Sequence, residues 1–215
     1  MKCNPNQSDS LRRQAKRAFT LIEMIGVLAV IAILAALLIP RVFSAINDAR
    51  VNGACINIET VKTALADHYG RYGKFDQQFG TNTAIPGLPI SAVVPNYDGI
   101  ILMAEGLLDK PFACSIAGGD PQAASTIEIC AGGQDNGAAG YALDGIANGT
   151  SSAQYVLEAK LTNVSAQDAK DLNDRIDGTS LGAADVTLAD TKGRVEYAAP
   201  NNGVVGAVYI YLTHR

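Results

Sequence analysis

Residues 17–43 read RAFTLIEMIGVLAVIAILAALLIPRVF, a nearly uninterrupted apolar stretch that decides how the chain is organised. Its 21 residues from Phe19 to Ile39 carry one charge, that of Glu23. An α-helix of this length spans about 31 Å, enough to cross a hydrocarbon core of about 30 Å. The stretch is also longer than the apolar region of a signal peptide, which has roughly 7–15 residues. A carboxylate in hydrocarbon costs about 2.5–3.5 kcal/mol on insertion scales. The stretch therefore predicts a membrane-spanning helix whose carboxylate needs a compensating partner.

The first 18 residues are basic, whereas the rest of the chain is acidic. They contain five Lys or Arg and one Asp, a charge of +4, so the net charge of −4 leaves −8 on residues 19–215. Because cations gather on the cytoplasmic side of membrane helices, the N-terminus is predicted in the cytoplasm and the body across the membrane. Proteins bind nucleic acid through cationic surfaces, and the body of this protein is acidic. No specific nucleic-acid site is therefore expected.

The helical pattern continues beyond Pro40, which closes the apolar run. Apolar or small residues recur in steps of mostly three and four, as on one face of an α-helix. They are Val42, Ala45, Ile46, Ala49, Gly53, Ile56, Val61, Leu65, Tyr69 and Tyr72. We expect one continuous helix from about Thr20 to Tyr69, with its stripe packed on the protein's own sheet and on neighbouring molecules. Gly26, Pro40 and Gly53 are the points where this helix can kink or locally unwind.

From about Gly70 the sequence changes to short runs separated by turns. Strand patterns occupy 125–131, 154–164, 193–199 and 203–213, and the last two read as a hairpin. A short helix is predicted to begin with Asp98 as its N-cap and to end before Pro111. A second helix opens at Ser165 and closes at Gly178. The body is therefore predicted to be α+β.

The stretch Arg17 to Glu23 resembles the processing site of type IV prepilins and type II secretion pseudopilins, and the similarity covers about residues 12–72. The resemblance implies a pilin-like α+β fold, in which a long N-terminal helix, transmembrane in its first half, packs on a C-terminal antiparallel β-sheet domain. The implied parts are a cleaved basic leader at 1–18, a transmembrane and filament-core helix at 19–39, its amphipathic continuation at 40–70, and a globular α+β head at 71–215.

The resemblance also assigns roles to single residues. A prepilin peptidase would cut between Ala18 and Phe19 and methylate the new amine of Phe19. The family usually has glycine before the cut, so Ala18 departs from it by one methyl group. Glu23 would pair with the Phe19 amine of a neighbouring subunit and set the register of assembly, since two buried charges are tolerable when paired. The alternative is that Glu23 faces water or a headgroup. Pro40 is the third residue expected to matter for assembly.

The implied function is that of a structural subunit of a type IV pilus-like filament, serving adhesion, twitching or DNA uptake. Its partners would be further copies in a helical homopolymer, the prepilin peptidase, an inner-membrane assembly platform and, before assembly, membrane lipid. The precursor would be a single-pass protein of the bacterial inner membrane, and the filament periplasmic or extracellular. The chain has no Trp, and it lacks the Trp-bearing C-terminal segment associated with major secretion pseudopilins, which favours the pilus.

Three alternatives stay open. One is a pseudopilin of a type II secretion system, and another is an uncut, signal-anchored domain that binds a surface ligand. The third, an exported enzyme, is disfavoured because His68 and His214 belong to no catalytic pattern. No cofactor is expected.

The cysteines and one acidic loop are the remaining candidates. In an exported body, a disulfide between Cys114 and Cys130 is the preferred pairing, with buried free thiols as the alternative and Cys55 left over. No metal site is predicted. The segment with Asp177, Asp185 and Asp190 is the one place where calcium is considered, because carboxylate oxygens suit Ca²⁺ and some pseudopilins bind it in a comparable loop.

Overall fold

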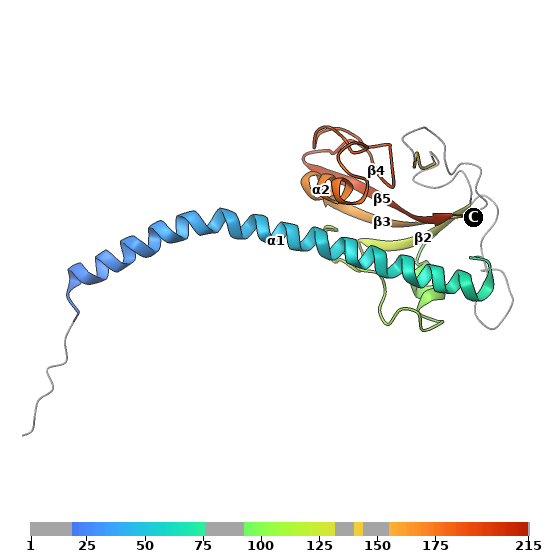
Figure 1. The fold of residues 1–215 in the computed structure, drawn as a ribbon, viewed down its shortest axis with the longest axis horizontal. Helices are drawn as coiled ribbons and strands as arrows, with labels where there is room; N and C mark the ends of the chain where they lie inside the picture. Colours follow the sequence, from blue (N-terminus) through green and yellow to red (C-terminus); the bar gives the residue numbers. More distant parts are fainter. Residues whose placement is uncertain (1–18, 76–92, 132–139, 144–154, 215) are drawn as a thin grey trace, which may run out of the picture. The chain divides into compact units, whose positions relative to one another are not determined.

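The computed structural model describes residues 19–75, 93–131, 140–143 and 155–214, and the protein divides into two units between Ser44 and Ala45. The first unit contains the start of helix α1 (Leu21–Tyr72), and the second contains its continuation and all the strands (Figure 1). The predicted leader, residues 1–18, lies outside the described residues.

Helix α1 is continuous over 52 residues and passes through Pro40, so the predicted unbroken helix is confirmed. Among the described helices it is the one long and apolar enough to cross a membrane. Its large apolar side chains in the first unit are all exposed, Leu21 and Leu37 to 77% and 67%. Because no described residue covers them, this segment needs an apolar environment from outside the single chain.

In the second unit, α1 buries one face against the sheet, at the helical spacing. The buried residues are Val51, Ala54, Ile58, Val61, Ala64, Leu65 and His68. This face differs from the predicted stripe. Val61 and Leu65 belong to both, but Ile56 is 65% exposed and Ile46 is 49% exposed. The helix has two apolar faces, of which the sheet covers one.

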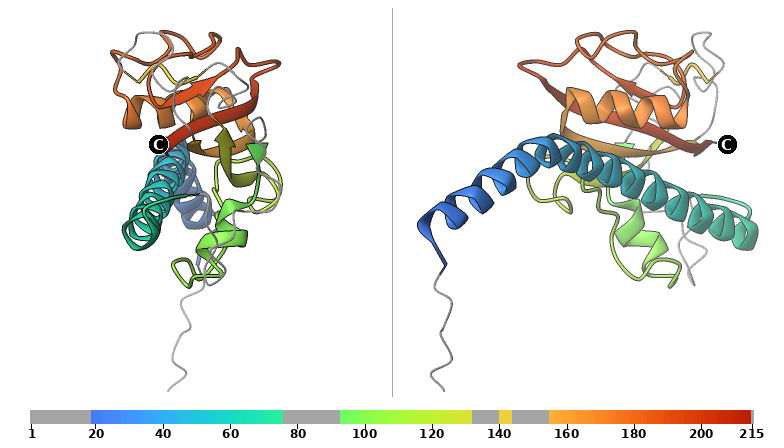
Figure 2. Two further views of the ribbon diagram at one scale, coloured as in Figure 1. Left: turned by 90° about the vertical axis from the view of Figure 1, so that its right-hand side faces the viewer. Right: turned by 60° about the vertical axis from the view of Figure 1, so that its left-hand side comes forward.

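The sheet has five antiparallel strands in the order β1-β2-β3-β5-β4. The strands are β1 (Val93–Val94), β2 (Ser125–Ala131), β3 (Tyr155–Ser165), β4 (Val195–Tyr197) and β5 (Val204–His214). The second half of α1 runs along the sheet (Figures 1 and 2). The predicted α+β architecture of a long N-terminal helix and a C-terminal antiparallel sheet is confirmed.

Helix α2 (Ala166–Ile176) is the second helix that the sequence predicts. The Ser165 hydroxyl accepts a hydrogen bond from the Asp168 amide at 3.1 Å, as an N-cap does, and Gly178 just past the end has φ +78°. Arg175 of α2 donates to Asp48 of α1 at 2.9 Å. An ion pair therefore links the two helices in the second unit.

The helix expected from Asp98 differs from the prediction. The structure has a five-residue π-helix, η1 (Asp98–Leu102), capped by Tyr97 without a side-chain bond. Asp98 does not cap it, because its Oδ2 accepts the Phe112 amide at 2.7 Å and thereby ties the start of this segment to its end. A long-range hydrogen bond thus replaces the local cap.

The predicted Cys114–Cys130 disulfide is not formed, and Cys55, Cys114 and Cys130 take part in no disulfide among the described residues. The Cys114 amide donates to Ser125 at the start of β2, whereas Cys130 lies five residues farther along this strand, a distance of about 16 Å. A disulfide needs Cα atoms within about 7 Å. Burial also raises the pKa of the Cys114 thiol to about 11, which keeps it protonated and unreactive.

Alkylation of the native protein is expected to separate these cysteines. Cys55 is half-buried, while Cys114 and Cys130 are fully buried, so Cys55 should be modified first. Peptide mapping after timed iodoacetamide treatment, without reduction, measures this order. A peptide cross-linked through Cys114 and Cys130 would contradict the structure.

Candidate functional site

The start of α1 is closed by two side chains that bond to each other's backbone. The Thr20 amide and hydroxyl both donate to Glu23 Oε2, each at 2.8 Å. In return, the Glu23 amide donates to the Thr20 hydroxyl at 3.3 Å. This is a capping box, in which the first and fourth residues satisfy amides that the helix leaves unpaired.

The capping box gives Glu23 a compensating partner within one chain. Its carboxylate lies at the positive end of the helix and holds two hydrogen bonds through Oε2. Within the described residues, Oε1 accepts no hydrogen bond. The carboxylate can therefore keep its cap and still receive a second donor from another molecule.

The structure brings only part of the predicted site together. Phe19 lies one residue before Thr20 and is 75% exposed, whereas Ala18 lies outside the described residues. Pro40 lies far along α1, where the following turn is held by a bond from the Ser44 hydroxyl to the Arg41 carbonyl at 2.9 Å.

The role of Thr20 as the N-cap of α1 is not among the predictions from the sequence. The signal was present, because threonine followed by glutamate three residues later, ahead of an apolar run, is the capping-box pattern. A near version of this pattern, a serine with Asp168 three residues later, predicts the start of α2 at Ser165.

The two histidines take structural positions. His68 Nδ1 lies 2.7 Å from Glu105 Oε2, and these side chains are 0% and 1% exposed. The His68 ring packs against Tyr72 and Phe75, with centroids 5.0 and 6.3 Å away. His214 at the end of β5 is hydrogen-bonded to Tyr211.

The three aspartates considered for calcium do not converge on one point. Asp177 accepts the Arg194 and Val195 amides, and burial raises the pKa of its carboxyl despite these bonds. Asp190 accepts the Ala183 and Lys192 amides, and Asp185 binds its neighbour Thr187. These carboxylates hold the loop's backbone. Within the described residues, potential metal ligands converge instead at Glu128, Cys130 and Glu158.

Comparison with known protein families matches residues 13–39 to the prokaryotic N-terminal methylation motif. The match includes Ala18, Phe19 and Glu23 and ends with the apolar run at Ile39. No curated protein and no solved structure matches the chain. The capped start of α1 thus lies inside a motif found at the N-terminus of a class of exported proteins, and the resemblance seen in the sequence is confirmed.

Proposed function

We propose that this protein, which carries the N-terminal methylation motif and the pilin-like fold of type IV pilins and pseudopilins, is a structural subunit of a type IV pilus-like filament. The observation that carries the proposal is the position of the motif on a helix whose apolar segment no described residue covers. Lipid covers this segment before assembly, and the same segment of neighbouring copies covers it afterwards. The protein's chemistry is assembly rather than catalysis.

A second exposed surface supports packing between copies. Ile46 and Ile56 lie on the face of α1 that the sheet does not cover, and they are 49% and 65% exposed. Neighbouring subunits would bury both parts of α1, consistent with the stripe that the sequence predicts.

Glu23 would link neighbouring subunits through the Phe19 amine. After cleavage between Ala18 and Phe19, the new ammonium lies at the start of the helix, within reach of a neighbour's carboxylate. Glu23 Oε2 is held by Thr20, which leaves Oε1 for this contact. A buried ion pair is tolerable where each charge alone is costly, so pairing selects one stagger between helices.

The processing partners follow from the motif. A prepilin peptidase would cut and methylate the precursor at the inner membrane, with the basic leader in the cytoplasm, and an assembly platform would extract the product. The pseudopilus of a type II secretion system is the alternative, since its subunits share the motif and the fold.

Mass spectrometry of the mature N-terminus tests this function. We expect an N-methylated Phe19 as the first residue in cells that contain a prepilin peptidase, and intact precursor in cells that lack it. A mature chain that retains Met1 in both would contradict the proposal and support an uncut membrane anchor.

Replacing Thr20 by valine tests the cap. The change removes the hydroxyl that accepts the Glu23 amide and donates to its carboxylate, at nearly constant size. Hydrogen exchange at the Glu23 amide, measured by NMR in detergent micelles, should accelerate about fivefold, the usual effect of losing an N-cap. Thr20→Ser retains the hydroxyl and is the matched control. Equal exchange in the two variants would show that the hydroxyl is not the cap.

A further inference from the structure

Two glutamates face each other across the middle of the sheet. Glu128 of β2 and Glu158 of β3 are directly opposite in the antiparallel register, and they are only 5% and 1% exposed. Like charges placed opposite each other on a sheet are destabilising, and burial increases the cost. A cation shared by the two carboxylates would lower this cost.

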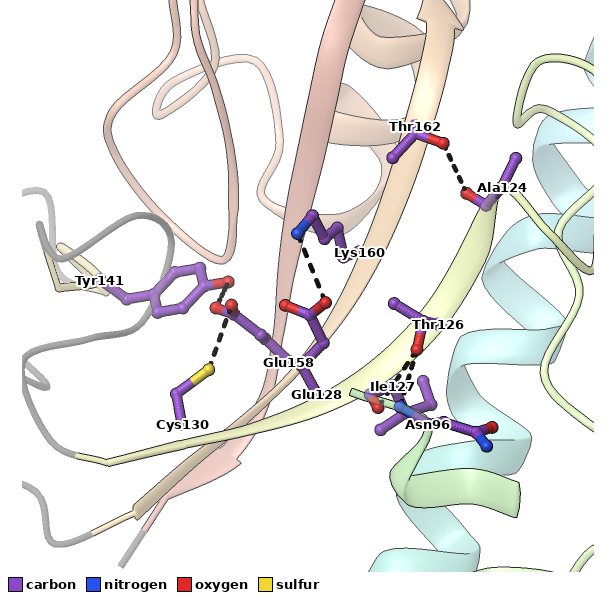
Figure 3. A network of polar contacts seen from close by, with 10 residues as sticks. All are labelled: Asn96, Ala124, Thr126, Ile127, Glu128, Cys130, Tyr141, Glu158, Lys160 and Thr162. Carbon is purple, nitrogen blue, oxygen red and sulfur yellow. Dashed lines mark hydrogen bonds and ion pairs between the residues drawn. The ribbon is translucent and has the colours of Figure 1, made fainter. Parts of the chain in front are cut away.

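A thiol completes the group. Cys130 follows Glu128 by two residues on β2, so both side chains leave the same face of the strand. Cys130 Sγ lies 3.4 Å from Glu158 Oε1. One oxygen of each glutamate and Cys130 Sγ all lie within 4.8 Å of one another, and all three residues are buried. Figure 3 shows the Cys130 sulfur turned toward the Glu158 carboxylate, with the Glu128 carboxylate beside them and turned toward Lys160.

We propose that Glu128, Cys130 and Glu158 bind a divalent transition-metal cation, zinc above all, that cross-links β2 to β3. A thiolate with two carboxylates is a ligand set suited to Zn²⁺ and unsuited to Ca²⁺ or Mg²⁺, which take oxygen ligands. Binding converts the Cys130 thiol to a thiolate and releases one proton to solvent.

The spacing of the atoms fits a tetrahedral ion. With Zn–S of about 2.3 Å and Zn–O of about 2.0 Å, sulfur and oxygen ligands of one zinc lie about 3.5 Å apart. The observed distance between Cys130 Sγ and Glu158 Oε1 is 3.4 Å. This pair therefore needs almost no movement to share a cation.

Tyr141 orients the carboxylate of Glu158, and Lys160 competes with the metal for the carboxylate of Glu128. The Tyr141 hydroxyl donates to Glu158 Oε2 at 2.7 Å, which directs Oε1 to the proposed ion, as outer hydrogen bonds do in metal sites. Burial raises the pKa of Tyr141, so this hydroxyl remains a donor. On the other side, Lys160 Nζ lies 3.4 Å from Glu128 Oε1 (Figure 3). Lys160 would compete with the metal for Glu128.

Cobalt titration of the full chain in detergent tests the proposal, since Co²⁺ occupies zinc sites and reports on its ligands. We expect a sulfur-to-cobalt charge-transfer band together with the d–d bands of tetrahedral cobalt, both reversed by Zn²⁺. Cys130→Ser should abolish the charge-transfer band, and Glu158→Gln should weaken cobalt affinity more than about 100-fold, beyond the effect of losing an outer-shell group. Cys55→Ser, on α1, is the matched control and should leave the titration unchanged.

Lys160→Gln provides a test that does not depend on removing a ligand. Because it removes a competing charge, cobalt affinity should rise at least about fivefold. Zinc should also raise the thermal unfolding temperature of the wild type and of Cys55→Ser, but not that of Cys130→Ser. The proposal is overturned if no charge-transfer band forms, if the band survives Cys130→Ser, or if Lys160→Gln binds cobalt no more tightly than the wild type.

Discussion

Glu23→Ala is expected to abolish filament assembly while the protein still inserts into the membrane at its normal level. The substitution removes a charge that is costly in hydrocarbon, so insertion should be unchanged or improved. It also removes the proposed partner of the neighbouring Phe19 amine, which would leave that ammonium unpaired in the filament core. Sheared-filament yield, measured against the amount of membrane-bound subunit, gives the result.

Two further variants distinguish the charge from the cap. Glu23→Gln keeps an oxygen for the Thr20 amide but loses the charge, and it should assemble as poorly as Glu23→Ala. Glu59→Ala, which removes an exposed carboxylate elsewhere on α1, should assemble normally. Normal filament yield from Glu23→Gln would mean that capping, not pairing of charges, is what assembly requires.

His68→Ala is expected to lower the free energy of unfolding by about 2–4 kcal/mol, the combined cost of an unsatisfied buried carboxyl group and a cavity. His68 and Glu105 lie 2.7 Å apart and are at most 1% exposed, so the substitution strands a buried carboxyl. It also leaves a cavity against Tyr72 and Phe75. Denaturant unfolding of the full chain in detergent, followed by near-ultraviolet circular dichroism, measures the loss.

A surface pair on the same helix provides the control. Arg71 and Asp67 are also 2.7 Å apart, but about half of each side chain is exposed. Asp67→Ala should therefore lower the free energy of unfolding by less than about 1 kcal/mol. If the two substitutions lower the free energy of unfolding equally, burial does not determine how much the His68–Glu105 pair contributes to stability.

Local patterns predicted the regular elements well. Strand β2 was predicted at 125–131 and forms at Ser125–Ala131, because a short β-rich run between turns has few alternatives. Helix α2 followed from its cap at Ser165. The continuity of α1 past Pro40 followed from the apolar spacing, because packing and neighbouring turns can sustain a helix around one missing hydrogen bond.

Contacts between distant segments were beyond sequence reasoning. The spacing of Cys114 and Cys130 along the chain suggested a disulfide between them. In the structure, an extended strand separates the two residues. The pairing of Glu128 with Glu158 depends on strand register, which no local pattern specifies. On α1, two apolar faces were both compatible with the helical period, and only the sheet's position selects the one with Val51, Ala54 and Ile58.

The edge strands of the sheet affect how readily the protein forms cross-β aggregates. Both edge strands among the described residues are short, two residues in β1 and three in β4. An edge of this length offers few unpaired backbone groups to a second chain, so it is a poor template for cross-β aggregation. In the proposed filament, contacts between copies would therefore be made by helix α1 and not by the edges of the sheet.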